Sequence, residues 1–343
     1  MPDRDLPPLN RRAVVLFSGG LDSILASLLM RDLGIDALLV HFESAFYQGP
    51  LGTTRGTKDG AVRRAERLGF PVRVMAMGLD FLELLRQPAY GFGKNVNPCV
   101  DCKIHMMRRV RDLMIEEDRS FLVTGEVLGQ RPMSQRRDTF PRMEADAGLP
   151  GRILRPLSAG VLTPTLPETA GVVDRSRLLS ITGRSRKAQI VEVVKRGVAD
   201  YPGSAGGCLL TDPIYAPKLR HLLESKARVD YTDVLLLRIG RHLRLGDRAK
   251  AVVSRNEDEG KLLGHLRHAG TWHLRPANFT GPDGLVVGPS DREARGRLAA
   301  ILARYGKRPV APPWRVTATY RDQEETLEAA APFDDAVLRG MLI

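Results

Sequence analysis

Cysteine is scarce in this chain, with three residues in 343. So few cysteines exclude a disulfide framework, and the Cys99-x-x-Cys102 spacing favours metal or redox chemistry in a reducing compartment. Long apolar runs are also missing, since none approaches the roughly 20 residues that span a bilayer. The start, MPDRDLPPLNRR, has acidic residues and prolines where a signal peptide has an apolar core. We therefore expect a cytoplasmic protein with no membrane partner.

Acidic residues are too few to balance the basic ones, 40 against 52, which leaves a net charge of +12. A positive field attracts polyanions and supports phosphate contacts to RNA or DNA. A solvated, arginine-rich surface would give the same total, so charge alone does not decide. The Walker pattern GxxxxGK[ST] is absent too, which argues against a site that holds a γ-phosphate for transfer.

Strand-like and helix-like segments alternate along the first two thirds of the chain. This alternation predicts an α/β fold, a doubly wound parallel sheet that binds ligands at the carboxyl ends of its strands. We expect this domain over residues 1–225 and a second, smaller α+β domain over residues 226–343. The strand ends place several candidate nucleotide-binding residues on one edge: Ser18, His41, Phe42, Gly125 and, in the following loop, Gln130.

The segment LFSGGLDS, residues 16–23, has the composition of an anion-binding turn. Gly19 and Gly20 lack a Cβ, so the backbone can turn tightly and bring its N–H groups to an anion at the start of the next helix. Ser18 and Ser23 add hydroxyl donors. Asp22 is suited to an outer contact with Mg²⁺. The segment therefore predicts a phosphate site for ATP.

SGGLDS between a strand and a helix resembles the PP-loop ATP pyrophosphatases, which share an adenine nucleotide alpha hydrolase-like fold. The segments NPCVDC, TGEVLGQ and ILRPLS are similar to the tRNA-thiolating subgroup, the 4-thiouridine and 2-thiouridine synthetases. This resemblance covers residues 13–215. It implies that ATP is split into pyrophosphate and AMP, that AMP is transferred to a uridine carbonyl oxygen, and that sulfur then replaces this oxygen.

The three cysteines resemble the subgroup members that bind a 4Fe-4S cluster through three thiolates, which implies Cys99, Cys102 and Cys208 as ligands and sulfur-transfer residues. Two alternatives use the same residues: a persulfide passed between Cys102 and Cys208, or zinc with His105 as a fourth ligand. Asp101 is a candidate for orienting or deprotonating the uracil, with a solvated turn carboxylate as the alternative.

The implied partners are tRNA and a sulfur donor, either sulfide or a persulfide carrier, and a homodimer is compatible with the sequence. The segment from residue 239 to 263 resembles the RNA-binding domain of NFACT-type proteins. Candidate phosphate contacts are Arg131, Arg136, Arg137, Arg184, Arg186 and Lys187 in the first domain, and Arg241, Arg244, Arg248, Lys250 and Arg255 in the second. A merely solubilising basic face is the alternative.

The function predicted from these features is ATP-dependent tRNA thiolation. One rival is a PP-loop ligase or amidating enzyme for a small molecule, in which the CxxC pair holds a structural zinc. Another is a non-catalytic RNA-binding factor that kept the nucleotide fold, which an intact SGGLDS segment disfavours.

Overall fold

A computed structural model describes the chain except residues 1–4, 47–59, 204–207, 247–248, 268–269 and 308–310. It has two compact units, Met1–Asp212 and Pro213–Ile343, here called unit 1 and unit 2. The division falls before α8 (Tyr215–Ser225), so this helix lies with unit 2 and not, as expected from the sequence, with the first domain.

Unit 1 is built on a five-stranded sheet in the order β3-β2-β1-β4-β5, in which every pairing is parallel. The α/β prediction is therefore confirmed. The strands are β1 (Arg12–Leu16), β2 (Asp36–Glu43), β3 (Val72–Ala76), β4 (Phe121–Thr124) and β5 (Ile153–Leu154). Near-continuous apolar runs form these strands because a parallel sheet is covered on both faces.

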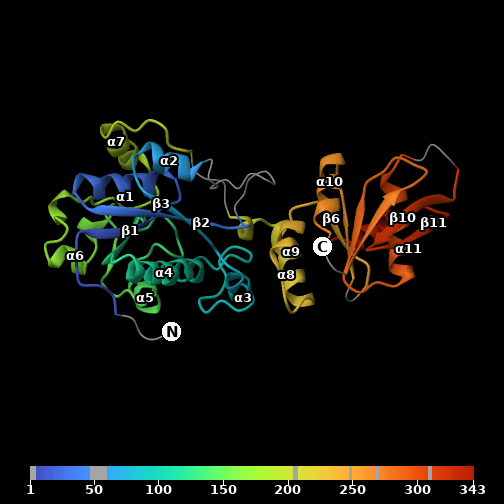
Figure 1. Ribbon diagram of the computed structural model, residues 1–343, viewed down its shortest axis with the longest axis horizontal. Helices are drawn as coiled ribbons and strands as arrows, with labels where there is room; N and C mark the ends of the chain where they lie inside the picture. The colour runs from blue at the N-terminus through green and yellow to red at the C-terminus, as the bar shows by residue number, and fades with distance from the viewer. Residues whose placement is uncertain (1–4, 47–59, 204–207, 247–248, 268–269, 308–310) are drawn as a thin grey trace. The chain divides into compact units, whose positions relative to one another are not determined.

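Helices cover both faces of this sheet (Figure 1): α1, α2 and α7 lie on one side, and α4 and α5 on the other. The helices are α1 (Leu21–Asp32), α2 (Ala61–Arg67), α3 (Asp80–Leu84), α4 (Cys99–Glu116), α5 (Thr139–Asp146), α6 (Leu166–Thr169) and α7 (Lys187–Lys195). Ile24, Leu28 and Val193 belong to the core cluster that packs α1 and α7 on the sheet. The covering helices leave the carboxyl edge of the strands for ligands.

Helix α4 begins at Cys99, so both cysteines of the CxxC pair belong to its first turn and do not precede it. Its buried residues Ile104, Met107, Val110 and Met114 recur every three or four positions and form one face against the sheet. Because Cys99 and Cys102 are three residues apart, they lie on neighbouring positions of the same helix face.

Unit 2 contains a six-stranded antiparallel sheet in the order β11-β10-β8-β9-β7-β6, in line with the expected second α+β domain. Its strands are β6 (Arg241–Arg244), β7 (Lys250–Val253), β8 (Thr271–Pro276), β9 (Gly284–Val287), β10 (Trp314–Tyr320) and β11 (Gln323–Ala329). Besides α8, its helices are α9 (Tyr231–Leu236), α10 (Glu257–His265), α11 (Arg292–Tyr305) and α12 (Asp335–Met341). The buried face of α11 packs on this sheet through Leu298, Ile301 and Leu302.

No helix in the described part of the chain combines the length and apolar character needed to cross a membrane.

Candidate active site

The loop between β1 and α1 has the form of a phosphate-binding turn. Gly19 takes a positive φ of 72°, and Gly20 is the N-cap of α1 with an extended backbone. The Ser18 hydroxyl accepts a hydrogen bond from the Gly20 N–H at 3.3 Å and lies 3.2 Å from the Ser23 hydroxyl. Among the residues that the structure describes, no side chain caps the first N–H groups of α1, and these groups are the donors that an anion at a helix start requires.

Two glycines permit close backbone approach around this turn. A Cβ on Gly19 would lie 2.9 Å from the Cα of Ala61, at the start of α2. A Cβ on Gly125, directly after β4, would lie 2.7 Å from the carbonyl carbon of Asp22 and 2.8 Å from the Ser23 nitrogen. Gly125 is therefore required because the end of β4 packs against the first turn of α1.

Asp22 is surrounded by polar side chains that leave its carboxyl group incompletely bonded. Its Oδ1 atom is buried and has no hydrogen-bond partner among the described residues, and the Arg186 guanidinium lies 3.8 Å from Oδ2. Gln130 and Gln189 lie beside the carboxyl without reaching hydrogen-bond geometry. Burial raises the pKa of Asp22, against the opposing charges of Arg186 and Arg131. A cation at Oδ1 would supply the missing contact.

Gln189 was not predicted from the sequence. It is fully buried on α7, and neither its amide nitrogen nor its amide oxygen has a partner in the described structure. The sequence could have indicated Gln189, because it is a polar residue on the apolar face of the amphipathic segment 186–197. Arg186 was predicted as an RNA contact, but its position beside Asp22 makes it a candidate phosphate ligand instead.

The three cysteines come together from two distant segments. Cys99 and Cys102 lie in the first turn of α4, and Cys208 follows residues that the structure does not describe. The Cys208 segment is held by backbone hydrogen bonds from Val96 N–H to Leu210 O at 3.1 Å and from Leu209 N–H to Phe46 O at 2.8 Å. The Asn95 amide donates to Thr211 O at 2.7 Å. These contacts bring Cys208 to the amino end of α4.

Each of these thiols lies within electrostatic range of another. Burial, and then the neighbouring Cys208 and Cys99, raise the pKa of Cys102 well above its usual range. Burial raises the pKa of Cys208 to about 11, while the Arg131 charge opposes this rise. Both groups are therefore protonated thiols at neutral pH, and neither is an activated nucleophile without a bound metal or another stabilising cation.

Three neighbouring thiols are a donor set for soft metal ions. In the parts of the chain that the structure describes, no three His, Cys, Asp or Glu side chains are placed as ligands of one metal ion. One zinc ion needs its sulfur ligands at about 2.3 Å from a common centre, so a single-ion site is not preformed. In a four-iron cluster each cysteine binds a different iron, so the three sulfurs sit farther apart than around one ion. Three thiolates are a donor set that such a cluster uses.

His105 does not serve the zinc alternative. Its Nε2 atom is hydrogen-bonded to Met77 O at 2.8 Å, its Nδ1 lies 3.8 Å from Asp80 Oδ2, and its ring packs on Phe81 at 5.6 Å between centroids. It therefore joins α4 to the segment after β3. Asp101 is buried and accepts hydrogen bonds from the Tyr90 N–H at 3.2 and 3.3 Å, so a solvated carboxylate is excluded.

His41 and Phe42 lie in β2 and are buried. His41 Nδ1 is 2.9 Å from Phe17 O, so it donates to the residue that precedes the phosphate loop. This contact ties the end of β2 to the loop. The nucleotide contacts expected of His41 and Phe42 stay predictions.

A buried ionic network lies next to the cysteines and was not predicted from the sequence. Glu126, one residue beyond Gly125, pairs with Lys103 of α4 and with Arg155 Nε at 3.0 Å. Arg155 also pairs with Glu144 of α5 at 2.5 Å. Burial alone would raise the pKa of Glu126, but the charges of Lys103 and Arg155 outweigh it and lower that pKa. The network fixes the first turn of α4, and with it Cys102, against β4 and α5.

Comparison with family models gives two matches, one in each unit. Residues 9–159 match the model described as thiamine biosynthesis protein (ThiI), and residues 240–339 match the NFACT protein RNA binding domain. Residues 9–159 form a ThiI-like PP-loop ATP pyrophosphatase domain. Unit 2 accordingly carries an NFACT-type RNA-binding domain. The ThiI-like domain includes the phosphate loop and the CxxC pair, while Cys208 and Gln189 lie beyond the matched residues.

Solved structures show more distant likeness. The C-terminal part of a fibronectin/fibrinogen-binding protein from Streptococcus suis is 17% identical with a TM-score of 0.26, covering 38% of this chain and 61% of that one. NMN synthetase from Francisella tularensis is 15% identical, with a TM-score of 0.32 and coverage of 66% and 81%. The U34-tRNA thiolase NcsA from Methanococcus maripaludis, solved with its [4Fe-4S] cluster, is 14% identical, with a TM-score of 0.32 and coverage of 68% and 73%.

Likeness of this degree carries no information about activity. The chain spans less than two thirds of the length of the Streptococcus suis structure. No match was found among curated proteins.

The NFACT-type domain divides the basic residues expected to contact RNA. Arg241 and Arg255 line one groove, whereas Lys250 lines a separate cavity and is only 6% exposed. Lys250 therefore does not lie on the groove with Arg241 and Arg255, because β7 is buried along its whole length, and its phosphate contact stays a prediction. Arg244 is exposed on β6, and Arg248 lies outside the described residues.

Proposed function

We propose that the chain is an ATP-dependent tRNA sulfurtransferase. The observation that carries the proposal is the convergence of three thiols beside the phosphate loop. Arg131 lies within electrostatic range of both Asp22 and Cys208. The phosphate loop and the cysteines are therefore neighbours of the same arginine. An RNA-binding domain in the same chain favours an RNA substrate over a small molecule.

The chain's own groups suit adenylation. The free N–H groups at the start of α1 would hold the pyrophosphate portion of ATP, and Arg186 would contact a phosphate oxygen. Asp22 Oδ1 would supply one ligand to Mg²⁺, which usually binds one or two carboxylates together with phosphate oxygens and water. A uracil carbonyl oxygen attacks the α-phosphorus and pyrophosphate leaves. A sulfur nucleophile then attacks the uracil carbon that carries the adenylated oxygen. The bond between this carbon and the oxygen breaks, and AMP departs with the original oxygen.

Cys99, Cys102 and Cys208 would hold a 4Fe-4S cluster in this proposal. Thiolates are the ligands that such clusters use, and three of them leave one of four irons without a protein ligand. When bound, the cluster would supply an iron at which sulfide can be held. The Asn97 amide, which donates to Cys99 Sγ at 3.4 Å, would stabilise a thiolate at that position.

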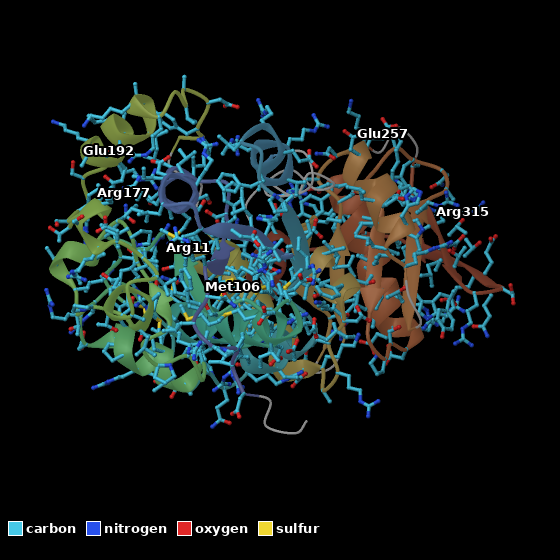
Figure 2. All side chains as sticks on the ribbon, turned by 60° about the vertical axis from the view of Figure 1, so that its left-hand side comes forward. Arg11, Met106, Arg177, Glu192, Glu257 and Arg315 are labelled. Atoms are coloured by element: carbon cyan, nitrogen blue, oxygen red, sulfur yellow. The ribbon has the colours of Figure 1, made fainter. Side chains whose placement is uncertain are left out.

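RNA contact is assigned to a groove of ≈ 1050 Å³ on unit 2. Its cations come from β6, α10, β8 and the residues around them: Arg241, Arg255, Lys261, Arg275 and Lys307. Arg241 stacks on the Tyr305 ring at 4.7 Å from its centroid, which holds the guanidinium in place. Glu257 of α10 also lines the groove, and Figure 2 shows its side chain. Such a surface binds RNA phosphates and makes no base-specific contacts.

The test uses the full chain, purified without oxygen, with ATP, sulfide and bulk tRNA. We expect AMP and pyrophosphate, and a thiolated nucleoside detected by mass spectrometry of digested tRNA. The variant Asp22→Asn should lose both products. Cys208→Ser should keep AMP formation and lose the thiolated nucleoside, because adenylation precedes sulfur transfer.

Metal analysis of the same preparation separates the cofactor alternatives. Iron and acid-labile sulfide in stoichiometric amounts would support the cluster, whereas zinc without iron would exclude it. Thiolation by a metal-free preparation that is supplied with a persulfide carrier in place of sulfide would favour the persulfide route through Cys102 and Cys208. If tRNA yields no AMP at all, the chain is not a tRNA-activating enzyme.

A further inference from the structure

Unit 2 contains a second cavity, separate from the basic groove, with a volume of ≈ 550 Å³. Its walls come from α8, β7, β8, β10 and the loop between β9 and α11, all within unit 2. This volume lies in the range of small-molecule sites. Neither the proposed thiolation chemistry nor the basic groove uses the residues that line it.

Lys250 of β7 lines this cavity with a buried ammonium group. Its residue is 6% exposed, and among the described residues it has no side-chain hydrogen bond and no ion pair. The carboxylate of Asp233, whose Oδ2 accepts a hydrogen bond from Lys226 Nζ at 2.6 Å, lies within electrostatic range of Lys250 and favours its charged form. Lys218 and Lys226 add like charge around Lys250. A buried cation with three unused donors is costly unless a ligand accepts from it.

Other polar atoms of the cavity are also left without partners in the described structure. The Ser290 Oγ and the His221 Nδ1 are buried and make no hydrogen bond. Burial, together with the charges of Lys250 and Arg244, lowers the pKa of His221, so its ring is neutral. The ammonium of Lys250, the hydroxyl of Ser290 and the neutral imidazole of His221 together suit an anion or carbonyl oxygen and a neighbouring polar group.

An aromatic surface lines the same cavity. Trp272 of β8 and Tyr320 of β10 pack at 5.4 Å between centroids, with their planes tilted by 31°. The Arg295 guanidinium lies 4.2 Å from the Trp272 centroid and fixes the indole from α11. Aromatic rings beside a cation are the combination that binds unpaired nucleotides, because every base has a π-face and every nucleotide a phosphate.

We propose that this cavity binds one unpaired nucleotide of the RNA substrate, with its base on the surface formed by Trp272 and Tyr320 and an acceptor oxygen at Lys250. The inference rests on the proposed RNA substrate, and it gives the second unit a base-accepting site in addition to the phosphate-binding groove. The site distinguishes RNA with an unpaired residue from a fully paired helix, since a stacked, paired base cannot enter a cavity.

The test measures Trp272 fluorescence in the full-length Trp314→Phe variant, which leaves one tryptophan of the two in the chain. A single-stranded oligouridylate and a blunt RNA hairpin closed by a tetraloop of abasic residues are the two probes. We expect the single strand to quench Trp272 and the hairpin not to do so. Tyr320→Leu and Lys250→Gln should each weaken the quenching titration by about tenfold or more.

The control is Arg315→Gln, which removes an exposed cation on β10 (Figure 2). In the wild-type chain this cation pairs with Glu328 at 3.1 Å. It should leave the titration unchanged. Equal quenching by the blunt hairpin would overturn the inference, as would full affinity in Lys250→Gln. Quenching by inorganic phosphate at the same concentration as the oligonucleotide would reduce the site to an anion site and overturn it too.

The fluorescence titration and the thiolation assay test the two proposals separately. If tRNA is thiolated but the oligonucleotide does not quench Trp272, only the nucleotide site is refuted. If Trp272 is quenched as expected but no thiolated nucleoside forms, only the thiolation proposal is refuted.

Discussion

Replacement of Lys250 with methionine is expected to stabilise unit 2 at neutral pH. Burial, and secondarily the charges of Lys226 and Lys218, lower the pKa of Lys250 from 10.5 to about 8. The difference of about 2.5 units, at about 1.36 kcal/mol each, means that folding a charged Lys250 costs about 3 kcal/mol at pH 7. Methionine has a similar length and no charge, so it removes this cost with little change in volume.

The pH dependence has a defined sign. Below pH 8 the lysine is protonated in both the folded and the unfolded state, and the full cost is present. Between pH 8 and 10.5 the folded state releases the proton first, so the wild-type chain gains stability as the pH rises. The advantage of Lys250→Met should therefore fall from about 3 kcal/mol at pH 7 to less than about 1 kcal/mol at pH 10.

Both tryptophans of the chain, Trp272 and Trp314, lie in unit 2, so their fluorescence follows the unfolding of this unit within the full protein. Guanidinium titrations at pH 7 and pH 10 give the two free-energy differences. Lys261→Met is the control, because Lys261 is exposed on α10 and its ion pair with Glu257 is solvated. A Lys250→Met protein that is no more stable than wild type at pH 7, or whose advantage is the same at pH 10, would refute the reasoning.

Three further predictions concern unit 1. Gly125→Ala places a Cβ 2.7 Å from the Asp22 backbone, so the phosphate loop must shift, and AMP formation with tRNA should fall by about 100-fold while tryptophan-monitored unfolding is unchanged. Glu126→Gln leaves the charge of Lys103 unpaired and should destabilise unit 1 by about 3–5 kcal/mol in urea titrations followed by circular dichroism. The pKa of Glu126 is lowered in the folded state, so the difference in unfolding free energy between wild type and Glu126→Gln should be complete at neutral pH. It should disappear as the pH falls through that pKa. A difference that stays constant down to pH 2 would contradict this prediction. Asp101→Asn retains an oxygen to accept the backbone N–H, so thiolation should change by less than about tenfold, and a larger loss with AMP formation intact would make Asp101 the uracil-orienting group.

The strand, turn and helix around residues 16–23 could be predicted from the sequence because their determinants are local. Strand, glycine turn and helix follow one another within residues 12–32, and parallel pairing of β4 beside β1 then brings Gly125 to the same edge. The proximity of the three cysteines was expected from the resemblance to three-cysteine enzymes, and their role as ligands stays a prediction. The position of Cys208, however, depends on hydrogen bonds to residues more than a hundred positions earlier, which no local pattern encodes.

The second unit was predicted less well for a structural reason. Between residues 241 and 255 every arginine and lysine appears equivalent in the sequence. The β6–β7 hairpin, in the register Arg244 opposite Lys250, then separates them. Lys250 belongs to a strand that is buried throughout, whereas Arg241 and Arg255 flank the open groove. Side-chain direction in a hairpin follows from its register, and the register is set by contacts with the rest of the sheet.

The attachment of the Cys208 segment has a consequence for dynamics. Its position in unit 1 depends on a few hydrogen bonds to residues 46, 95 and 96, each contributing about 0.5–1.5 kcal/mol net, and not on membership of the sheet. Opening this segment therefore costs a few kcal/mol, far less than unfolding the unit. Cys208 can leave the other two thiols and return while the phosphate loop stays intact. The rate at which a thiol reagent labels Cys208 reports this local equilibrium.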